Sequence, residues 1–160
     1  MIKKIKDNIF QLNFNNFGSC VYLIKNEKNI LIDSSSNDNS KELIQDLKEI
    51  GLEVNDIEIL LLTHNHWDHI GNNDLFENSK IYDFENINNF KFKGMEIFKV
   101  PGHTKDSLAF LYNKVLFSGD TLFDKGIGRT DFSESEPEKM QKSLELLRNL
   151  DYEFLAPGHI

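Results

Sequence analysis

The sequence contains little cysteine, little proline and no long hydrophobic run. Its single cysteine, Cys20, excludes an internal disulfide and a cluster of thiolate ligands. With three prolines and no stretch rich in proline and glycine, nothing indicates a linker, so we expect one domain over residues 1–160. No apolar run approaches the roughly 20 residues of a membrane-spanning helix. The sequence therefore predicts a folded protein without a disulfide framework and without a membrane partner.

Positive charge is also scarce relative to negative charge. The formal net charge is −8 at pH 7, and the lysines are scattered among acidic residues. Because nucleic-acid-binding proteins normally carry a basic patch, we expect no nucleic-acid partner. Asp7, Asn8 and Gln11 interrupt the segment in which a signal peptide would be apolar. We therefore expect a cytoplasmic protein.

The hydrophobic pattern alternates between the periods of strands and helices. A helix is expected from Ser40, as its N-cap, to Gly51. Leu43 and Leu47 recur at helical spacing within it, and a second helix is expected over residues 137–150. Strands are expected at residues 2–5, 8–14, 20–24, 29–33, 57–63, 79–84, 95–100, 107–112, 114–120 and 153–156. This order predicts a layered α/β protein.

The histidines all follow expected strands, and they are His64, His66, His69, His103 and His159. His64 and His66 are two apart in an extended segment, so their side chains point to the same side and can approach one ion. Asp68 and His69 follow directly and must turn elsewhere, where they can serve a second ion. Packing gives no reason to gather these side chains, and mixed nitrogen and oxygen ligands suit zinc, iron or manganese.

The segment THNHWDH resembles the H-x-H-x-D-H signature of the metallo-β-lactamase fold. The rest of that family's pattern follows in order, as PGHT, SGD and PGH. The resemblance implies an α/β protein with a four-layer αββα sandwich and a metal site at one edge of its two sheets. It implies one ion held by His64, His66 and His103, a second held by Asp68, His69 and His159, and Asp120 as the bridge between them.

Two divalent ions in such a site retain positive charge after the two carboxylates are counted. That charge favours a bridging hydroxide, because metal ions lower the pKa of bound water toward ~7. Zinc is the expected metal, with iron or manganese as alternatives. Metal-binding histidines usually need outer partners that fix the ring, and the candidates are Asp33, Thr63, Thr104 and Ser118.

A second resemblance is narrower. The run GDTLFDKGIGRTDF resembles the glyoxalase II-like branch of the family. It implies that Arg129 contacts the substrate, and an ion pair of Arg129 with Asp131 or Asp124 is an equal alternative. Glyoxalase II has an aromatic residue where this chain has Asp131, and we expect no additional C-terminal helical domain.

The reaction class follows from the absence of a spare histidine. If every imidazole binds metal, none serves as general acid, so the leaving group must depart without a proton, as a thiolate can. We therefore expect a metal-dependent hydrolase of thioester or ester bonds, of the glyoxalase II (hydroxyacylglutathione hydrolase) type. Its substrate would be a small acyl thioester, its nucleophile a metal-bridging hydroxide, and Asp68 a catalytic residue.

Two other functions share these residues. Persulfide dioxygenases of the same branch bind a single iron, and their pattern corresponds to His64, His103 and Asp120. Two imidazoles and one carboxylate suit non-haem iron and O₂. A non-catalytic module that keeps metal for stability is a third possibility, although structural zinc sites usually have four closed ligands. A homodimer is compatible with a chain of this size.

Overall fold

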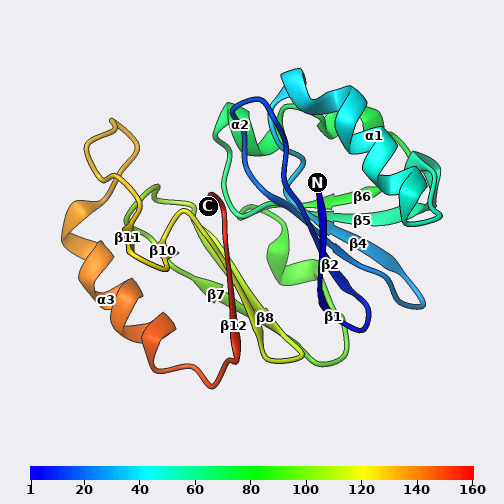
Figure 1. Ribbon diagram of the computed structural model, residues 1–160. Coiled ribbons are helices and arrows are strands. Elements are labelled where there is room, and N and C mark those ends of the chain that lie inside the picture. Colours follow the sequence, from blue (N-terminus) through cyan, green and yellow to red (C-terminus); the bar gives the residue numbers. More distant parts are fainter. The chain divides into compact units, whose positions relative to one another are not determined.

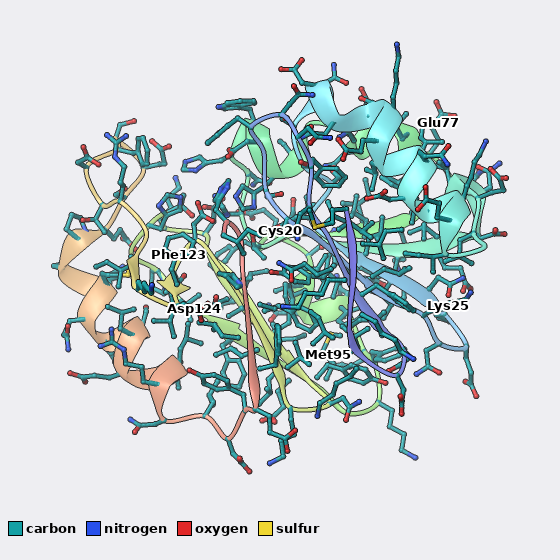
Figure 2. All side chains as sticks on the ribbon, viewed as in Figure 1. Cys20, Lys25, Glu77, Met95, Phe123 and Asp124 are labelled. Atoms are coloured by element: carbon teal, nitrogen blue, oxygen red, sulfur yellow. The ribbon has the colours of Figure 1, made fainter.

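The chain divides into two units, Met1–Tyr82 and Asp83–Ile160, each with one large sheet, and the second unit also contains a two-stranded sheet. The computed structural model describes residues 1–160 (Figure 1). No helix in it combines the length and the apolar character that a membrane span needs. Cys20, labelled in Figure 2, is buried in the first unit, where Gln11 Nε2 donates a hydrogen bond to its sulfur.

The first unit contains a six-stranded sheet whose strands lie in their order along the sequence. They are β1 (Ile2–Lys6), β2 (Ile9–Leu12), β3 (Val21–Ile24), β4 (Asn29–Ile32), β5 (Ile57–Leu61) and β6 (Lys80–Tyr82). Strands β1 to β4 pair antiparallel, whereas β4 pairs with β5, and β5 with β6, in parallel. Parallel pairing brings the carboxyl ends of β4 and β5 to the same edge of the sheet.

Helix α1 (Ser40–Glu49) packs its apolar side on this sheet, where Leu43 and Leu47 join the core. The predicted N-cap was wrong by one residue: Asn39 caps the helix, because the 3-10 turn η1 (Asn37–Asn39) leads directly into it. The remaining helical elements of the unit are short, namely η2 (Val54–Asp56), α2 (Trp67–Ile70) and η3 (Asn73–Phe76).

The second unit contains a four-stranded sheet in the order β12-β9-β8-β7. Its strands are β7 (Met95–Lys99), β8 (Leu108–Tyr112), β9 (Val115–Gly119) and β12 (Phe154–Pro157). A small hairpin is formed by β10 (Leu122–Phe123) and β11 (Gly126–Ile127), and η4 (Ile87–Asn89) precedes the sheet. Strand β12 runs parallel to β9, so the chain leaves both strands at the same edge.

Helix α3 (Pro137–Arg148) covers the second sheet, as the sequence predicts, with proline in its first turn. Met140, Leu144 and Leu147 pack with sheet residues such as Leu116 in one core cluster. Each unit therefore consists of a sheet with a helix on it, and each leaves polar loops at the carboxyl ends of its parallel strands.

Candidate metal centre

In the first unit, the histidine motif begins in the extended segment that follows β5. His64 Nε2 lies 3.0 Å from His66 Nδ1, so the two rings lie on the same side as predicted. His66 is the N-cap of α2, and Asp68 and His69 lie within that helix. His64, Asp68 and His69 are all buried. The centre of the His64 ring lies 4.6 Å from that of His66 and 4.0 Å from that of His69, so the motif gathers three imidazoles.

Asp33, directly after β4, organises the residues behind this motif. One carboxylate oxygen accepts the backbone N–H of Thr63 at 2.8 Å. The other oxygen accepts the Thr63 hydroxyl at 2.8 Å and the His69 Nδ1–H at 2.7 Å. Asp33 reaches this position with a φ of 61°, an uncommon value for a residue other than glycine. The two parallel strands make the arrangement possible, since they bring Asp33 beside Thr63.

These contacts fix which nitrogen of each ring carries the proton. The Thr63 hydroxyl has one hydrogen, which it donates to Asp33, so His64 Nδ1, 3.1 Å from that oxygen, must donate to it. His69 Nδ1 faces a carboxylate and is likewise a donor. The Nε2 atom of each ring therefore carries the lone pair that binds a metal ion.

The donor set fits a divalent cation. Two lone pairs that face one another at 3.0 Å, as those of His64 and His66 can, repel unless a positive charge lies with them. Two ligand nitrogens on a tetrahedral zinc ion are about 3.3 Å apart, given Zn–N bonds of 2.0–2.1 Å. The separation of the two rings is close to that value.

In the second unit, Asp120 and His159 follow the parallel strands β9 and β12. Gly158 N–H donates to the carbonyl of Gly119 at 2.9 Å and keeps His159 beside Asp120. One oxygen of Asp120 lies 3.6 Å from His103 Nε2 and 3.4 Å from His159 Nε2. A carboxylate oxygen between two imidazole nitrogens is the arrangement expected of the bridging residue.

His103 lies in the loop between β7 and β8, and its ring is held by a group that the sequence did not indicate. Its Nδ1–H donates to the backbone carbonyl of Arg129 at 2.7 Å, which leaves the lone pair on Nε2. Gly128 permits this approach, because a Cβ atom there would lie 1.8 Å from the carbonyl oxygen of Asp120. The second glycine of the G-I-G-R run, Gly128, is the sequence signal that could have revealed this contact of His103.

The expectations for the outer partners are confirmed in part. Asp33 and Thr63 contact imidazoles, as described above. Thr104 and Ser118 were wrong: the Thr104 hydroxyl bonds that of Ser107 at 2.8 Å, and the Ser118 hydroxyl donates to the carbonyl of Leu122 at 2.6 Å. Thr104 lies in the loop after β7 and Ser118 near the end of β9, where a hydroxyl has nearby backbone and side-chain partners.

Arg129 pairs with Asp131 and not with Asp124. Its Nε and Nη2 donate to the two oxygens of Asp131 at 2.9 and 2.8 Å. This bond lowers the pKa of Asp131 and raises that of Arg129, so both groups stay charged near neutral pH. Both side chains are exposed. The guanidinium also lies 4.7 Å from the ring centre of Phe132.

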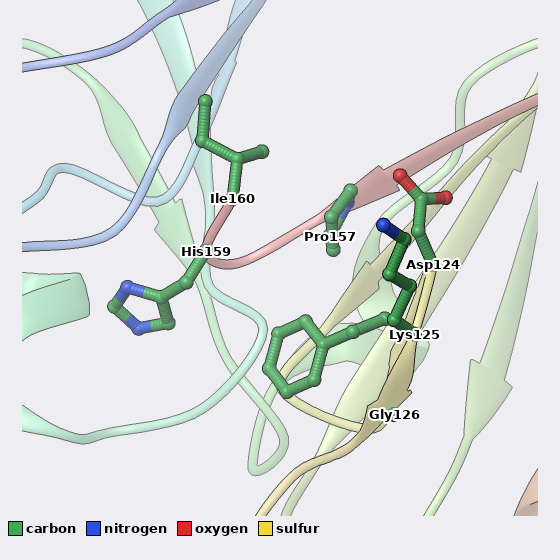
Figure 3. A pocket seen from close by; sticks show the side chains of 7 residues that line it. Asp124, Lys125, Gly126, Pro157, His159 and Ile160 are labelled. Atoms are coloured by element: carbon green, nitrogen blue, oxygen red, sulfur yellow. The ribbon is translucent and has the colours of Figure 1, made fainter.

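A cavity of about 450 Å³ lies beside His159 in the second unit (Figure 3). The β10–β11 hairpin forms one wall and the end of β12 the other. Apolar and charged side chains share the lining, which consists of Phe123, Asp124, Lys125, Gly126, Pro157, His159 and Ile160. A cavity next to a candidate ligand offers room for part of a substrate.

Comparison with known proteins now identifies the family. The sequence profile described as the Metallo-beta-lactamase superfamily matches residues 15–83 and 83–159. The chain belongs to the metallo-β-lactamase superfamily. Crystal structures agree: TTHA1623 in a di-iron-bound form has a TM-score of 0.79 at 24% identity, covering 94% of this chain and 92% of that one. The predicted metallo-β-lactamase fold class is thereby confirmed.

Relatives of this superfamily member include hydrolases. A probable metallo-hydrolase of Methanocaldococcus jannaschii is 29% identical, covering 94% of this chain and 92% of the relative. The hydroxyacylglutathione hydrolase GloC of Haemophilus influenzae is 30% identical, covering 88% and 84%. ETHE1 from Myxococcus xanthus has a TM-score of 0.75 at 25% identity, covering 100% of this chain and 76% of that one. The chain spans about half the length of several other curated relatives that it matches.

Proposed function

We propose that this superfamily member is a metal-dependent hydrolase of thioesters. The observation that carries the proposal is the tautomer of three imidazole rings, meaning which ring nitrogen carries the proton. His64, His69 and His103 each have an acceptor at Nδ1, so each presents the Nε2 lone pair. Rings fixed in this way serve as metal ligands.

The ligand assignment combines this geometry with the pattern of the superfamily. We assign His64, His66 and His103 to one ion, Asp68, His69 and His159 to the second, and Asp120 to both. Zinc is the metal we propose first, with iron or manganese as alternatives. Two such ions supply a polarised substrate carbonyl and a bound water of lowered pKa.

The protein's own groups have defined tasks in this reaction. Asp33, Thr63 and the carbonyl of Arg129 keep the rings in the ligating tautomer throughout the reaction. The Asp68 carboxylate, which is buried, would orient the attacking water toward the substrate carbonyl. The cavity beside His159 would take part of the substrate and exclude bulk water from it.

The nature of the leaving group follows from this assignment. With every histidine used as a ligand, no imidazole is left to protonate an amine. A thiol has a pKa near ~8.5 and can leave as the thiolate. The substrate class is therefore a small acyl thioester, in agreement with the name of the GloC relative. Arg129, at the surface beside His103, is a proposed substrate contact.

Iron chemistry is the second candidate, because the likeness to a di-iron form of TTHA1623 favours iron as a metal for this fold. In the persulfide alternative a single iron, and not the two of TTHA1623, would be held by His64, His103 and Asp120, and the reaction would be oxidation of a persulfide by O₂. His66 and His159 would then be dispensable for metal binding.

Elemental analysis of protein produced with both zinc and iron, followed by assays, separates the two functions. Near two ions per chain, with hydrolysis of S-lactoyl or other acyl thioesters, is the expected result. One iron per chain with O₂ consumption on glutathione persulfide would support the alternative. Fully loaded protein that hydrolyses no acyl thioester above background would overturn the proposal.

A further inference from the structure

The segment 128–136 contains neither helix nor strand, yet it contacts the loop that carries His103. Three hydrogen bonds join its far end to this loop, one of them from the Lys105 N–H to the carbonyl of Glu134 at 3.0 Å. The Ser135 hydroxyl donates to the carbonyl of His103 at 2.6 Å, and the Glu136 N–H donates to the carbonyl of Gly102 at 2.9 Å. An irregular segment has no ladder of backbone hydrogen bonds, so its position depends on contacts of this kind.

At its near end, three side chains close a ring of contacts around His103. The carbonyl of Arg129 accepts the His103 Nδ1–H, and the guanidinium of the same residue covers the Phe132 ring. The Phe132 ring in turn meets the imidazole edge to face, with 5.7 Å between centres and an angle of 86°. Asp131 accepts two hydrogen bonds from the same guanidinium.

We propose that Arg129, Asp131 and Phe132 form a latch that positions His103 for metal binding. The carbonyl of Arg129 fixes the tautomer, and the backbone that carries this carbonyl is kept in place by the side chain of the same residue. Each contact alone is weak at an exposed site. Together they restrain one short segment from two directions and prevent the imidazole from rotating.

The latch makes Arg129 a positioning residue in addition to any contact with substrate. It rests on the metal-binding part of the proposed function and not on hydrolysis. A substrate contact and a latch predict different effects of the same substitutions. Removal of a substrate contact changes KM or kcat and leaves metal binding unaltered, whereas removal of the latch changes the tautomer of His103 in the metal-free protein and the affinity for metal.

The direct test is ¹⁵N NMR of the histidine rings in the metal-free full chain at pH 8. Wild-type protein is expected to show His103 as a single tautomer with the proton on Nδ1. Phe132→Leu and Asp131→Asn should shift its ring nitrogens toward the averaged values of a mixture. Phe132→Tyr keeps the ring and should retain the wild-type spectrum.

Zinc affinity, measured by competition with a chromophoric chelator, gives the second measure. Phe132→Leu is expected to weaken binding about tenfold, at the low end for loss of an outer partner, and Asp131→Asn about threefold, as for an exposed pair. Asp151→Asn is the matched control, because it removes another exposed ion pair of the same unit, with Lys114. Circular dichroism confirms that each variant is folded.

Two results would overturn the latch. One is an unchanged His103 spectrum in folded Phe132→Leu and Asp131→Asn proteins, with zinc affinity within twofold of wild type. The other is a change in KM for thioesters in these variants at unaltered zinc affinity, which would make Arg129 a substrate contact only. Absence of hydrolysis would leave both measurements valid and would count only against the proposed function.

Discussion

The carboxylate of Asp33 and the ring of His69 form a buried pair, with 2.7 Å between Oδ2 and Nδ1. The residues are 36 positions apart and meet because β4 and β5 are parallel neighbours. A carboxylate behind a metal-binding imidazole sets its tautomer and increases its basicity. Asp33 thereby links the fold of the first sheet to the chemistry of the proposed centre.

Substitution of Asp33 by asparagine should weaken metal binding while leaving the fold intact. The amide has the same shape but lacks the charge that holds the His69 Nδ1–H. We expect affinity for zinc to fall by about 10–100-fold, measured by chelator competition. Asp38→Asn, which changes an exposed carboxylate of the same unit, is the control. Equal affinities of the two variants would contradict the role of Asp33.

Gly128→Ala should disrupt the second unit near His103. The new Cβ would lie 1.8 Å from the carbonyl oxygen of Asp120 and 3.0 Å from His103 Nδ1, so the segment must move. We expect a loss of about 1–3 kcal/mol in the free energy of unfolding, measured with urea. A Cβ at Gly126 would meet nothing within 4 Å, and Gly126→Ala should unfold like wild type. Equal stability of the two variants would rule out the close approach.

Metal titration of the wild-type protein should resolve a tight step and a weaker step. The side chain of His159, assigned to the second ion, is 26% exposed, whereas His64 and His103, assigned to the first, are buried, so water competes more readily at the second ion. We expect the two affinities to differ by about tenfold. His159→Ala should retain the tight step and lose the weak one. Two equal steps in calorimetry would count against this expectation.

The stability of the first unit should depend on pH through Asp46 in α1. Burial raises the pKa of Asp46, and the N-terminal ammonium of Met1, 3.2 Å away, lowers it in part. A raised value means that the folded protein binds the proton more tightly than the unfolded chain does. The contribution of Asp46 is thus greatest below its ordinary pKa of 3.8 and declines as the pH rises through the raised value.

Asp46→Asn removes this dependence, since the amide resembles the protonated acid. Relative to wild type, the variant should become more stable as the pH increases from 3 to 7. Urea denaturation at several pH values measures the difference. If the difference in free energy of unfolding between the variant and wild type stays constant or decreases with pH, burial does not destabilise the charged carboxylate of Asp46.

The turn between β8 and β9 offers a stabilising substitution. Asn113 and Lys114 have φ values of 49° and 63°, the conformation in which Asn-Gly is the favoured pair. Lys114→Gly should raise the free energy of unfolding by about 1 kcal/mol, because a side chain in the left-handed region is strained. The ion pair with Asp151 is lost as well, so Asp151→Asn alone serves to measure that part. A lower thermal midpoint for Lys114→Gly than for Asp151→Asn would contradict the expectation.

The sequence predicted those parts of the structure in which particular side chains recur at the regular spacing of a strand or a helix. His64 and His66 face one another because extended backbone alternates its side chains, and Asp68 and His69 follow in the short helix α2. Helix α3 was predicted because its apolar residues recur at helical spacing. These features are encoded locally, within a few residues.

Features that depend on backbone atoms or distant pairing escaped prediction. The partner of His103 is a carbonyl oxygen, which every residue carries, so only the close approach at Gly128 could have indicated it. The β10–β11 hairpin has strands of two residues each, too short to show alternation. Thr104 and Ser118 lie next to the motifs, but their hydroxyls bond Ser107 and the carbonyl of Leu122, and neither bonds an imidazole.

The order of the strands also bears on how the chain reaches its folded state. In the first sheet every strand pairs with its neighbour along the sequence, whereas β12 joins β9 across the whole length of α3. Contacts between nearby residues close small loops and form fast, while distant pairings are slow. The half of the proposed centre around His64 and His69 should therefore be organised early, and Asp120 and His159 should meet late. A metal ion present during refolding would encounter the first half before the second exists.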